Sequence, residues 1–233
     1  MENTLKVTGV LSDPTRFNIY EYLIKNRREV TVVEIAKAFD IHPNVARLHL
    51  TKLEDINLLV SFAQKTGKGG RPSRIYKLSD EVVELNFPHR DYKMLSTIAL
   101  EAFVELGEPG KQALYNTGKK YGEKVMMRYQ TSGYENLDIE RKIHILEDAG
   151  TILGMYPKFE YNPENKTVSF KVNNCPFKEV ASKNNNNDMI CKMHHAYLKG
   201  MFESLFTEIE LVETENMFDG CENCSYVAQL TNV

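Results

Sequence analysis

The four cysteines of this 233-residue chain all follow residue 174, at Cys175, Cys191, Cys221 and Cys224. Cys221 and Cys224 form a Cys-x-x-Cys turn, which can direct two sulfurs at one centre, and Cys175 precedes a proline. Cys191 is predicted at the start of a helix, where backbone amides would lower the pKa of its thiol. The intervals of 15 and 29 residues between Cys175, Cys191 and Cys221 are typical of an assembled site rather than a compact finger. The number and spacing of the cysteines favour a metal or cluster site, with redox thiols and buried structural cysteines as alternatives.

Two histidines extend this chemistry. His194 and His195 lie three and four residues after Cys191, so on a helix either can share its face. His194, at i+3, is the better candidate as a substitute ligand, although adjacent histidines are more often structurally neutral.

The sequence gives little support to catalysis. It contains no carboxylate pair, phosphate loop, dinucleotide fingerprint or triad, so we predict that the protein is not an enzyme. A thiol oxidoreductase using Cys221 and Cys224 is the alternative in that class.

The chain has neither a signal-peptide core in Met1–Lys6 nor an apolar run of about 18 residues, so we expect a cytoplasmic protein without membrane contact. In that compartment cysteines are more often thiols or metal ligands than disulfides.

A second chemical pattern occupies His42–Leu78. Val45, Leu48, Leu53 and Ile56 recur at near-helical spacing and are predicted to form a buried stripe. Two short apolar runs, 58–63 and 75–78, follow it and are separated by a basic loop rich in glycine. A recognition helix followed by such a hairpin is the layout of a winged helix-turn-helix. The residues expected to contact DNA are Asn44, Arg47, His49, Thr51 and Lys52 on the helix and Lys68, Arg71 and Arg74 on the wing.

The net charge also differs between the N-terminal part of the chain and the remainder. Residues 1–90 carry 14 Lys and Arg against 11 Asp and Glu, and the remainder carries 15 against 21. The charge alone fits DNA binding and a solvated basic loop equally well, and the position of the hairpin next to a helix-turn-helix pattern favours DNA binding.

The elements that position these residues can be outlined. Asp13-Pro14 is predicted to open one helix, and Thr31 with Glu34 forms a capping-box pattern for a second, 31–39. Helices are expected over 92–106, 111–129 and 137–155, as connection and dimer surface or as a self-contained bundle. Strands are expected at 158–161, 167–172, 207–212 and 225–230 around a helix at 189–206. We therefore predict an α+β protein with a DNA-binding domain (1–90), a helical linker and dimerisation region (91–156) and a cysteine-containing sensor domain (157–233).

The first of these parts resembles the ArsR/MarR-type winged-helix regulators. The resemblance rests on Leu11–Arg16, Val45–Glu54 and Gly70–Tyr76 in this order. It implies a homodimeric repressor or activator that binds a pseudo-palindromic double-stranded DNA operator with half-sites about one helical turn apart.

The last part resembles the C-terminal domain of SufR-type repressors, in the segments Asn174–Phe177, Cys191–His194, Leu198–Met201 and Gly220–Tyr226. This resemblance implies an iron–sulfur cluster, 4Fe-4S or 2Fe-2S, that is held by cysteine thiolates and sets the affinity for DNA. The candidate ligands are Cys175, Cys191, Cys221 and Cys224. The alternative is a winged-helix regulator with structural zinc and a C-terminal domain that senses a small molecule.

Overall fold

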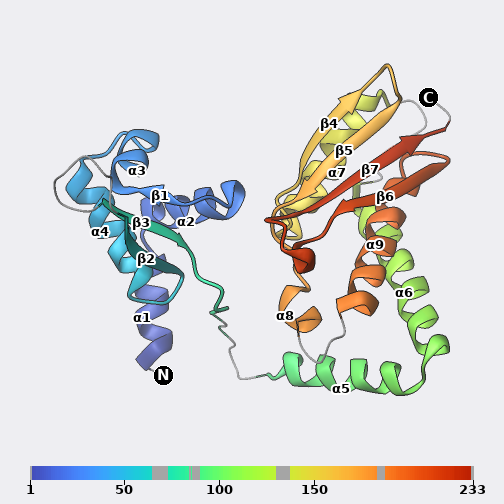
Figure 1. The fold of residues 1–233 in the computed structure, drawn as a ribbon, viewed down its shortest axis with the longest axis horizontal. Coiled ribbons are helices and arrows are strands. Elements are labelled where there is room, and N and C mark those ends of the chain that lie inside the picture. Colours follow the sequence, from blue (N-terminus) through green and yellow to red (C-terminus); the bar gives the residue numbers. More distant parts are fainter. Residues whose placement is uncertain are drawn as a thin grey trace. The chain divides into compact units, whose positions relative to one another are not determined.

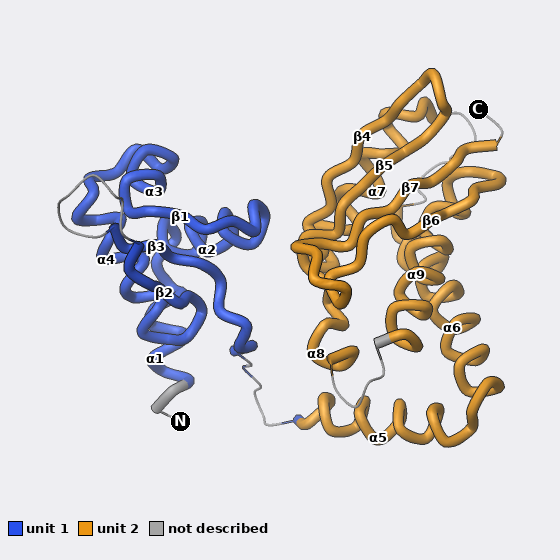
Figure 2. Tube along the Cα trace, in the orientation of Figure 1, with its two compact units in different colours: residues 1–90 blue, residues 91–233 orange. Residues whose placement is uncertain are grey.

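The computed structural model describes residues 2–64, 73–83, 85, 90–129, 137–182 and 187–231, except the side chains of residues 2, 3 and 187. The chain divides into two compact units, residues 1–90 and residues 91–233 (Figure 2). Residues 91–156 and 157–233, separated in the sequence-based prediction, share the second unit because helices of the first segment pack on the sheet and helix of the other.

Unit 1 joins four helices to a small antiparallel sheet (Figure 1). The sheet order is β1-β3-β2, and Ile19, Leu23, Ile35, Leu50 and Leu53 form the centre of the core. The elements in chain order are α1 (Glu2–Leu11), α2 (Pro14–Asn26), β1 (Val30–Thr31), α3 (Val32–Ala38), α4 (Pro43–Glu54), β2 (Leu59–Gln64) and β3 (Ser73–Leu78).

Side-chain caps fix the starts of three of these helices. Asp13 accepts a hydrogen bond from the amide of Arg16 at the start of α2, and Thr31 forms the predicted capping box with Glu34 before α3. His42 accepts from the amide of Asn44 at the start of α4, and Pro43 occupies a first-turn position where no amide partner is lost. The helix-turn-helix therefore begins where local sequence chemistry requires it.

Two elements of unit 1 were not predicted. Helix α1 buries Val7 and Val10 in the core, and β1 is a two-residue strand that pairs with β3 through Val30 and Tyr76. The strand β1 has no strong local signal, because two residues are too few for a pattern of alternation.

Unit 2 is built on a four-stranded antiparallel sheet of order β4-β5-β7-β6. Phe170, Tyr226 and Phe202 stack between this sheet and helix α9 in the core. The elements are α5 (Tyr92–Glu105), α6 (Glu108–Met126), η1 (Met127–Tyr129), α7 (Ile139–Ile152), β4 (Lys158–Asn162), β5 (Thr167–Val172), α8 (Lys178–Ala181), α9 (Asn187–Glu203), β6 (Ile209–Glu215), η3 (Met217–Asp219) and β7 (Cys224–Leu230).

Glycines allow α6 and α9 to pack backbone to backbone. A Cβ at Gly122 would overlap the carbonyl oxygen of Tyr197, and one at Gly200 would overlap that of Lys119. Gly118 has a similar relation to Met193. The two helix backbones are therefore in direct contact, and this contact positions α9, which carries Cys191 and His194.

None of the helices in the described ranges has the length and apolar character needed to cross a membrane.

Candidate functional site

The face of α4 that is exposed is not the face that the sequence predicted, because the helix is turned about its own axis relative to the prediction. Ala46, Leu50 and Leu53 point into the core, whereas Val45 is 40% exposed and Leu48 is 54% exposed. The predicted stripe through Val45 and Leu48 was therefore wrong. The spacing from Ala46 to Leu50 and Leu53 fits a helix equally well, and only the packing of α2 and α3 decided between the two phases.

The recognition surface consequently has both polar and apolar members. Asn44, Arg47 and Lys52 are exposed, and Thr51 is partly buried at the edge of the same face. Val45 and Leu48 join them, which the sequence-based prediction missed. Apolar side chains on a recognition helix can contact the methyl groups of thymine.

His49 does not belong to this surface. It was predicted to point outward, but it is 7% exposed and lies among Asp13 and Arg16 at the start of α2. Burial lowers the pKa of its imidazole, which the charge of Asp13 partly opposes. Its Nδ1 atom is buried and has no hydrogen-bond partner within the described residues. The prediction that His49 faces outward is thus corrected.

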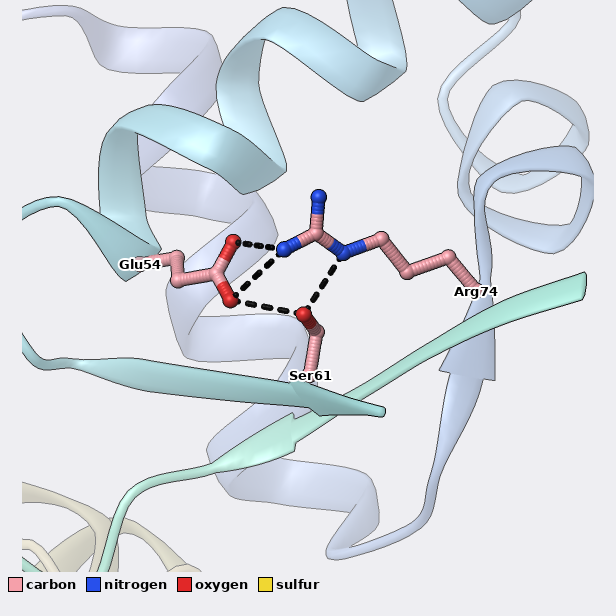
Figure 3. Close-up of polar contacts among 3 residues, drawn as sticks. All are labelled: Glu54, Ser61 and Arg74. Atoms are coloured by element: carbon pink, nitrogen blue, oxygen red, sulfur yellow. Dashed lines mark hydrogen bonds and ion pairs between the residues drawn. The ribbon is translucent and has the colours of Figure 1, made fainter. Parts of the chain in front are cut away.

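Arg74 is engaged inside unit 1 (Figure 3). Its Nη2 lies 3.1 Å from both carboxylate oxygens of Glu54 at the end of α4, and its Nε donates to Oγ of Ser61 at 2.6 Å. Ser61 Oγ in turn donates to Glu54 at 2.6 Å. Arg74 was predicted to contact DNA from the wing; here it ties β3 and β2 to the recognition helix. The other two wing candidates, Lys68 and Arg71, lie outside the described residues.

Three of the four cysteines come from different parts of unit 2. Cys175 follows β5, Cys191 lies on α9 and Cys224 begins β7. Burial raises the pKa of Cys175 to about 12 and that of Cys224 to about 11, although backbone hydrogen bonds at Phe177 and Met217 oppose the effect. These thiols are protonated at neutral pH unless a cation compensates for their charge.

Cys221 stands apart from this group. It is exposed on the turn before β7, whereas Cys224 is buried and accepts a hydrogen bond from the amide of Met217 at 3.5 Å. Among the described residues, which include all four cysteines, no three His, Cys, Asp or Glu side chains are arranged to hold a metal ion.

His194 is buried against Cys175. Its Nδ1 lies 3.6 Å from Sγ of Cys175, and its Nε2 lies 3.4 Å from Sδ of Met155. Burial lowers the pKa of His194 to about 4, so the ring is neutral at neutral pH. The neighbouring His195 instead donates from Nε2 to the carbonyl oxygen of Leu211 at 2.9 Å. His194, the predicted substitute ligand, is therefore the histidine that reaches a cysteine.

The environment of Cys191 differs from the prediction. Helix α9 begins at Asn187, so Cys191 lies beyond the first four amides that could stabilise a thiolate. Burial raises the pKa of its thiol, and a hydrogen bond with Asn216 opposes the effect. The thiol lines a groove of about 470 Å³ whose other members are Asp188, Lys192, His195, Glu213, Asn216, Phe218 and Asp219.

This groove was not predicted. Its members come from α9, β6 and the segment around η3, which are separated in the sequence. No local pattern signals such an assembly, since Glu213 and Asn216 read only as polar residues near a strand end.

Comparison with known proteins finds a family at the N-terminus. Residues 11–61 match the family described as a helix-turn-helix domain. No curated protein matches the chain.

Two solved structures are similar in fold to parts of the chain. One is the phenol-responsive sensory domain of the transcription activator PoxR with phenol, at 17% identity and a TM-score of 0.46, covering 79% of this chain and 89% of that one. The other is trafficking protein particle complex subunit 3 from Naegleria fowleri covalently bound to palmitic acid, at 12% identity and a TM-score of 0.42, covering 60% and 91%. At these values the likenesses assign no function to unit 2.

Proposed function

We propose that this chain is a DNA-binding transcriptional regulator in which unit 1 binds duplex DNA and unit 2 acts as a sensor. The observation that carries the proposal is the match of residues 11–61 to a helix-turn-helix domain, together with the exposed outer face of α4. In such domains the second helix enters the major groove, and its N-terminal residues contact base edges.

Base recognition falls to the exposed N-terminal half of α4. Arg47 has the geometry for two hydrogen bonds to guanine, Asn44 can pair with adenine, and Val45 and Leu48 can contact thymine methyl groups. Lys52, Lys68 and Arg71 would contact phosphate, and Thr51 lies at the border of the surface.

A selection from random duplexes tests this surface. Wild-type protein should select a defined sequence, and Arg47→Ala should lose about 1–3 kcal/mol on that sequence while binding unselected DNA as before. The matched control is Lys37→Ala, an exposed residue near the end of α3, which should not change the selected sequence. Equal losses on selected and unselected DNA would remove Arg47 from base recognition.

For unit 2 we propose that the thiols hold an iron–sulfur cluster, 4Fe-4S or 2Fe-2S. What supports the proposal is the chemistry of the donors: thiolates are the usual ligands of such clusters, and the buried Cys175 and Cys224 can ionise only beside a cation. A cluster would have to draw the thiols together, because no three of them are arranged as a metal site in the described residues. Cys175, Cys191, Cys221 and Cys224 would be the ligands, with His194 as a possible substitute for one of them. The bound cluster would supply a centre that changes charge and is lost under oxidation.

The contacts of the thiols would connect the cluster to the fold of unit 2. Cys175 joins the end of β5 to α9 through His194, and Cys224 joins β7 to the segment at Met217. A group that links these thiols would therefore hold the sheet, α9 and η3 together. We expect operator binding, whether for repression or activation, to depend on that link.

Absorption and metal analysis of protein purified without oxygen test the cluster. A brown protein with matching iron and sulfide supports the proposal, and its colour should be lost in Cys175→Ser and Cys224→Ser. The control is Ser182→Ala, at an exposed position that ends α8, which should remain brown. A colourless protein that stays so after reconstitution contradicts the proposal.

A second candidate keeps DNA binding and replaces the cluster with structural zinc and small-molecule sensing. The groove of about 470 Å³ beside Cys191 favours it, because its polar lining offers room for a ligand. Colourless protein with one equivalent of zinc would select this candidate.

We also propose that the active species is a homodimer on a pseudo-palindromic operator. A single helix-turn-helix contacts only a few base pairs, so two copies are needed to specify an operator.

A further inference from the structure

Leu48 is an apolar side chain at the middle of the outward face of the recognition helix α4. At about 100° per residue, it lies about 40° around the helix from Asn44 and about 60° from Thr51. Its side chain is 54% exposed. The apolar side chains of α4 that face the core lie on the opposite side of the helix, and they are Ala46, Leu50 and Leu53. A leucine therefore occupies the position from which this helix would reach furthest into a major groove.

The neighbours of Leu48 suit a duplex better than an apolar protein surface. Arg47 lies beside it, and Asn44 and Thr51 lie one turn before it and one turn after it. A cationic group and two hydrogen-bonding side chains around the leucine match the phosphates and base edges of DNA. Charge and hydrogen-bonding complementarity therefore favour duplex DNA, the partner in the proposed function, as the occupant of this face.

The floor of the major groove has few groups that an apolar side chain can cover. Each base pair presents hydrogen-bond donors and acceptors there, and the one apolar substituent is the methyl group at C5 of thymine. Covering polar base edges with a leucine costs free energy, because their hydrogen bonds to water are lost. A methyl group at C5 of cytosine occupies the same place in the groove. Thymine and 5-methylcytosine therefore offer Leu48 the same apolar contact, whereas uracil and cytosine do not.

Val45 extends the same apolar surface. It precedes Leu48 by three residues, lies about 60° from it around the helix and is 40% exposed. The rise over three helical residues, about 4.5 Å, is comparable with the spacing of successive base pairs, about 3.4 Å. The two side chains can therefore reach neighbouring base pairs and contact one methyl group each.

We propose that Leu48 and Val45 are specificity-determining residues that recognise the C5 methyl group of a pyrimidine, so that thymine and 5-methylcytosine are accepted at these positions and uracil and unmethylated cytosine are disfavoured. The proposal rests on the proposed function, since it requires that α4 enters the major groove. It adds a chemical class to that function: the preferred duplexes are those whose affinity changes when a single C5 methyl group is added or removed.

Anisotropy titrations of the full-length protein with the duplex selected from random sequences test the proposal. Replacing one thymine at a time with deoxyuridine removes only a methyl group and leaves every hydrogen-bonding group in place. Wild type should lose about fourfold in affinity at two neighbouring base pairs of a half-site, as the transfer free energy of one methyl group requires. Leu48→Ala should lose this effect at one of the two base pairs, and Val45→Ala at the other.

Methylated cytosine tests the chemical class. At the same two positions the thymine is replaced by cytosine, with guanine opposite, and the duplex is made with and without a C5 methyl group. Wild type should bind the 5-methylcytosine duplex about fourfold more tightly than the cytosine duplex. Each alanine variant should lose that difference at its own base pair only.

Leu5→Ala is the matched control, since Leu5 is a leucine on α1 that is 75% exposed, and this variant should keep both methyl effects. Equal binding of unselected duplex by wild type and all variants shows that each is folded. A selected duplex without a methyl-dependent position, a methyl effect that both α4 variants retain, or a uracil effect without a 5-methylcytosine effect would overturn the proposal. In these cases DNA is still bound and the proposed function stands, whereas a failure to select any duplex contradicts the proposed function itself.

Discussion

At the scale of single residues, a neutral imidazole and a protonated thiol share the interior of unit 2. His194 is enclosed by Cys175, Met155 and Phe177, so neither ring nitrogen meets water. This burial lowers the pKa of His194, so protonating its ring at acidic pH reduces the stability of unit 2.

We expect acid to destabilise unit 2 through His194. Its pKa is about 4 in the folded protein and about 6.5 unfolded, so the unfolded chain binds the proton more tightly. Stability is therefore lost as the pH falls from about 6.5 toward about 4, by about 2 kcal/mol between pH 7 and pH 5. The measurement is the denaturant dependence of Cys224 alkylation at both pH values. His194→Gln should lose this pH dependence, and His144→Gln, at an exposed site on α7, should keep it.

A variant of Arg74 can distinguish a residue that makes an internal contact from one that contacts DNA. Because it binds Glu54 and Ser61, Arg74→Ala should weaken DNA binding by misplacing the wing and leave the slope of log K against log salt unchanged. Lys52→Ala should reduce that slope by about one unit, as loss of a phosphate contact requires. Anisotropy titrations over a range of salt measure both. A reduced slope for Arg74→Ala would show that the arginine leaves Glu54 when DNA binds.

At the scale of elements, the closest contact in unit 2 is between α6 and α9. Three glycines, Gly118, Gly122 and Gly200, form this contact, and each lies against a backbone carbonyl oxygen of the other helix. The contact matters for the site because α9 presents Cys191, His194 and His195 to three different environments.

Gly122→Ala should destabilise unit 2 by about 3 kcal/mol, since the added methyl group meets the carbonyl of Tyr197 and the helices must separate. Thr117→Ala, on an exposed position of the same helix, should change stability by less than about 0.5 kcal/mol. Urea unfolding followed by Cys224 alkylation measures both. Equal stability of the two variants would mean that α6 shifts along α9 at little cost.

At the scale of the whole molecule, the distribution of charge and the association of two chains both affect DNA binding. Residues 1–90 carry a net charge of +3 and the remainder −6, so DNA should be drawn to unit 1. If the chain dimerises, the spacing of its half-sites is a geometric property of the pair.

Inserting about five base pairs, half a helical turn, between the half-sites of a selected operator should lower affinity to that of one half-site, because the second recognition helix then faces the wrong side of the duplex. Anisotropy titrations with the parent operator and a single half-site as references measure the effect. Unchanged affinity would show that two chains bind independently.

The sequence alone determined the features that depend on local chemistry. The caps at Asp13 and Thr31, the first-turn proline Pro43, the basic segment after α4 and the alternation of β4 and β5 each act within a few residues. The helix-turn-helix and most strands of unit 2 could therefore be predicted. The concentration of all cysteines after residue 174 was equally visible.

Only the tertiary structure decided which side of each element is covered. It turned Val45 and Leu48 outward and His49 inward, engaged Arg74 with Glu54, and buried Cys175 and Cys224 while leaving Cys221 exposed. It also placed residues 91–156 and the sheet in one compact unit. The physical reason is that periodicity limits a helix to a few equivalent faces, whereas the choice among them is made by elements distant in the chain.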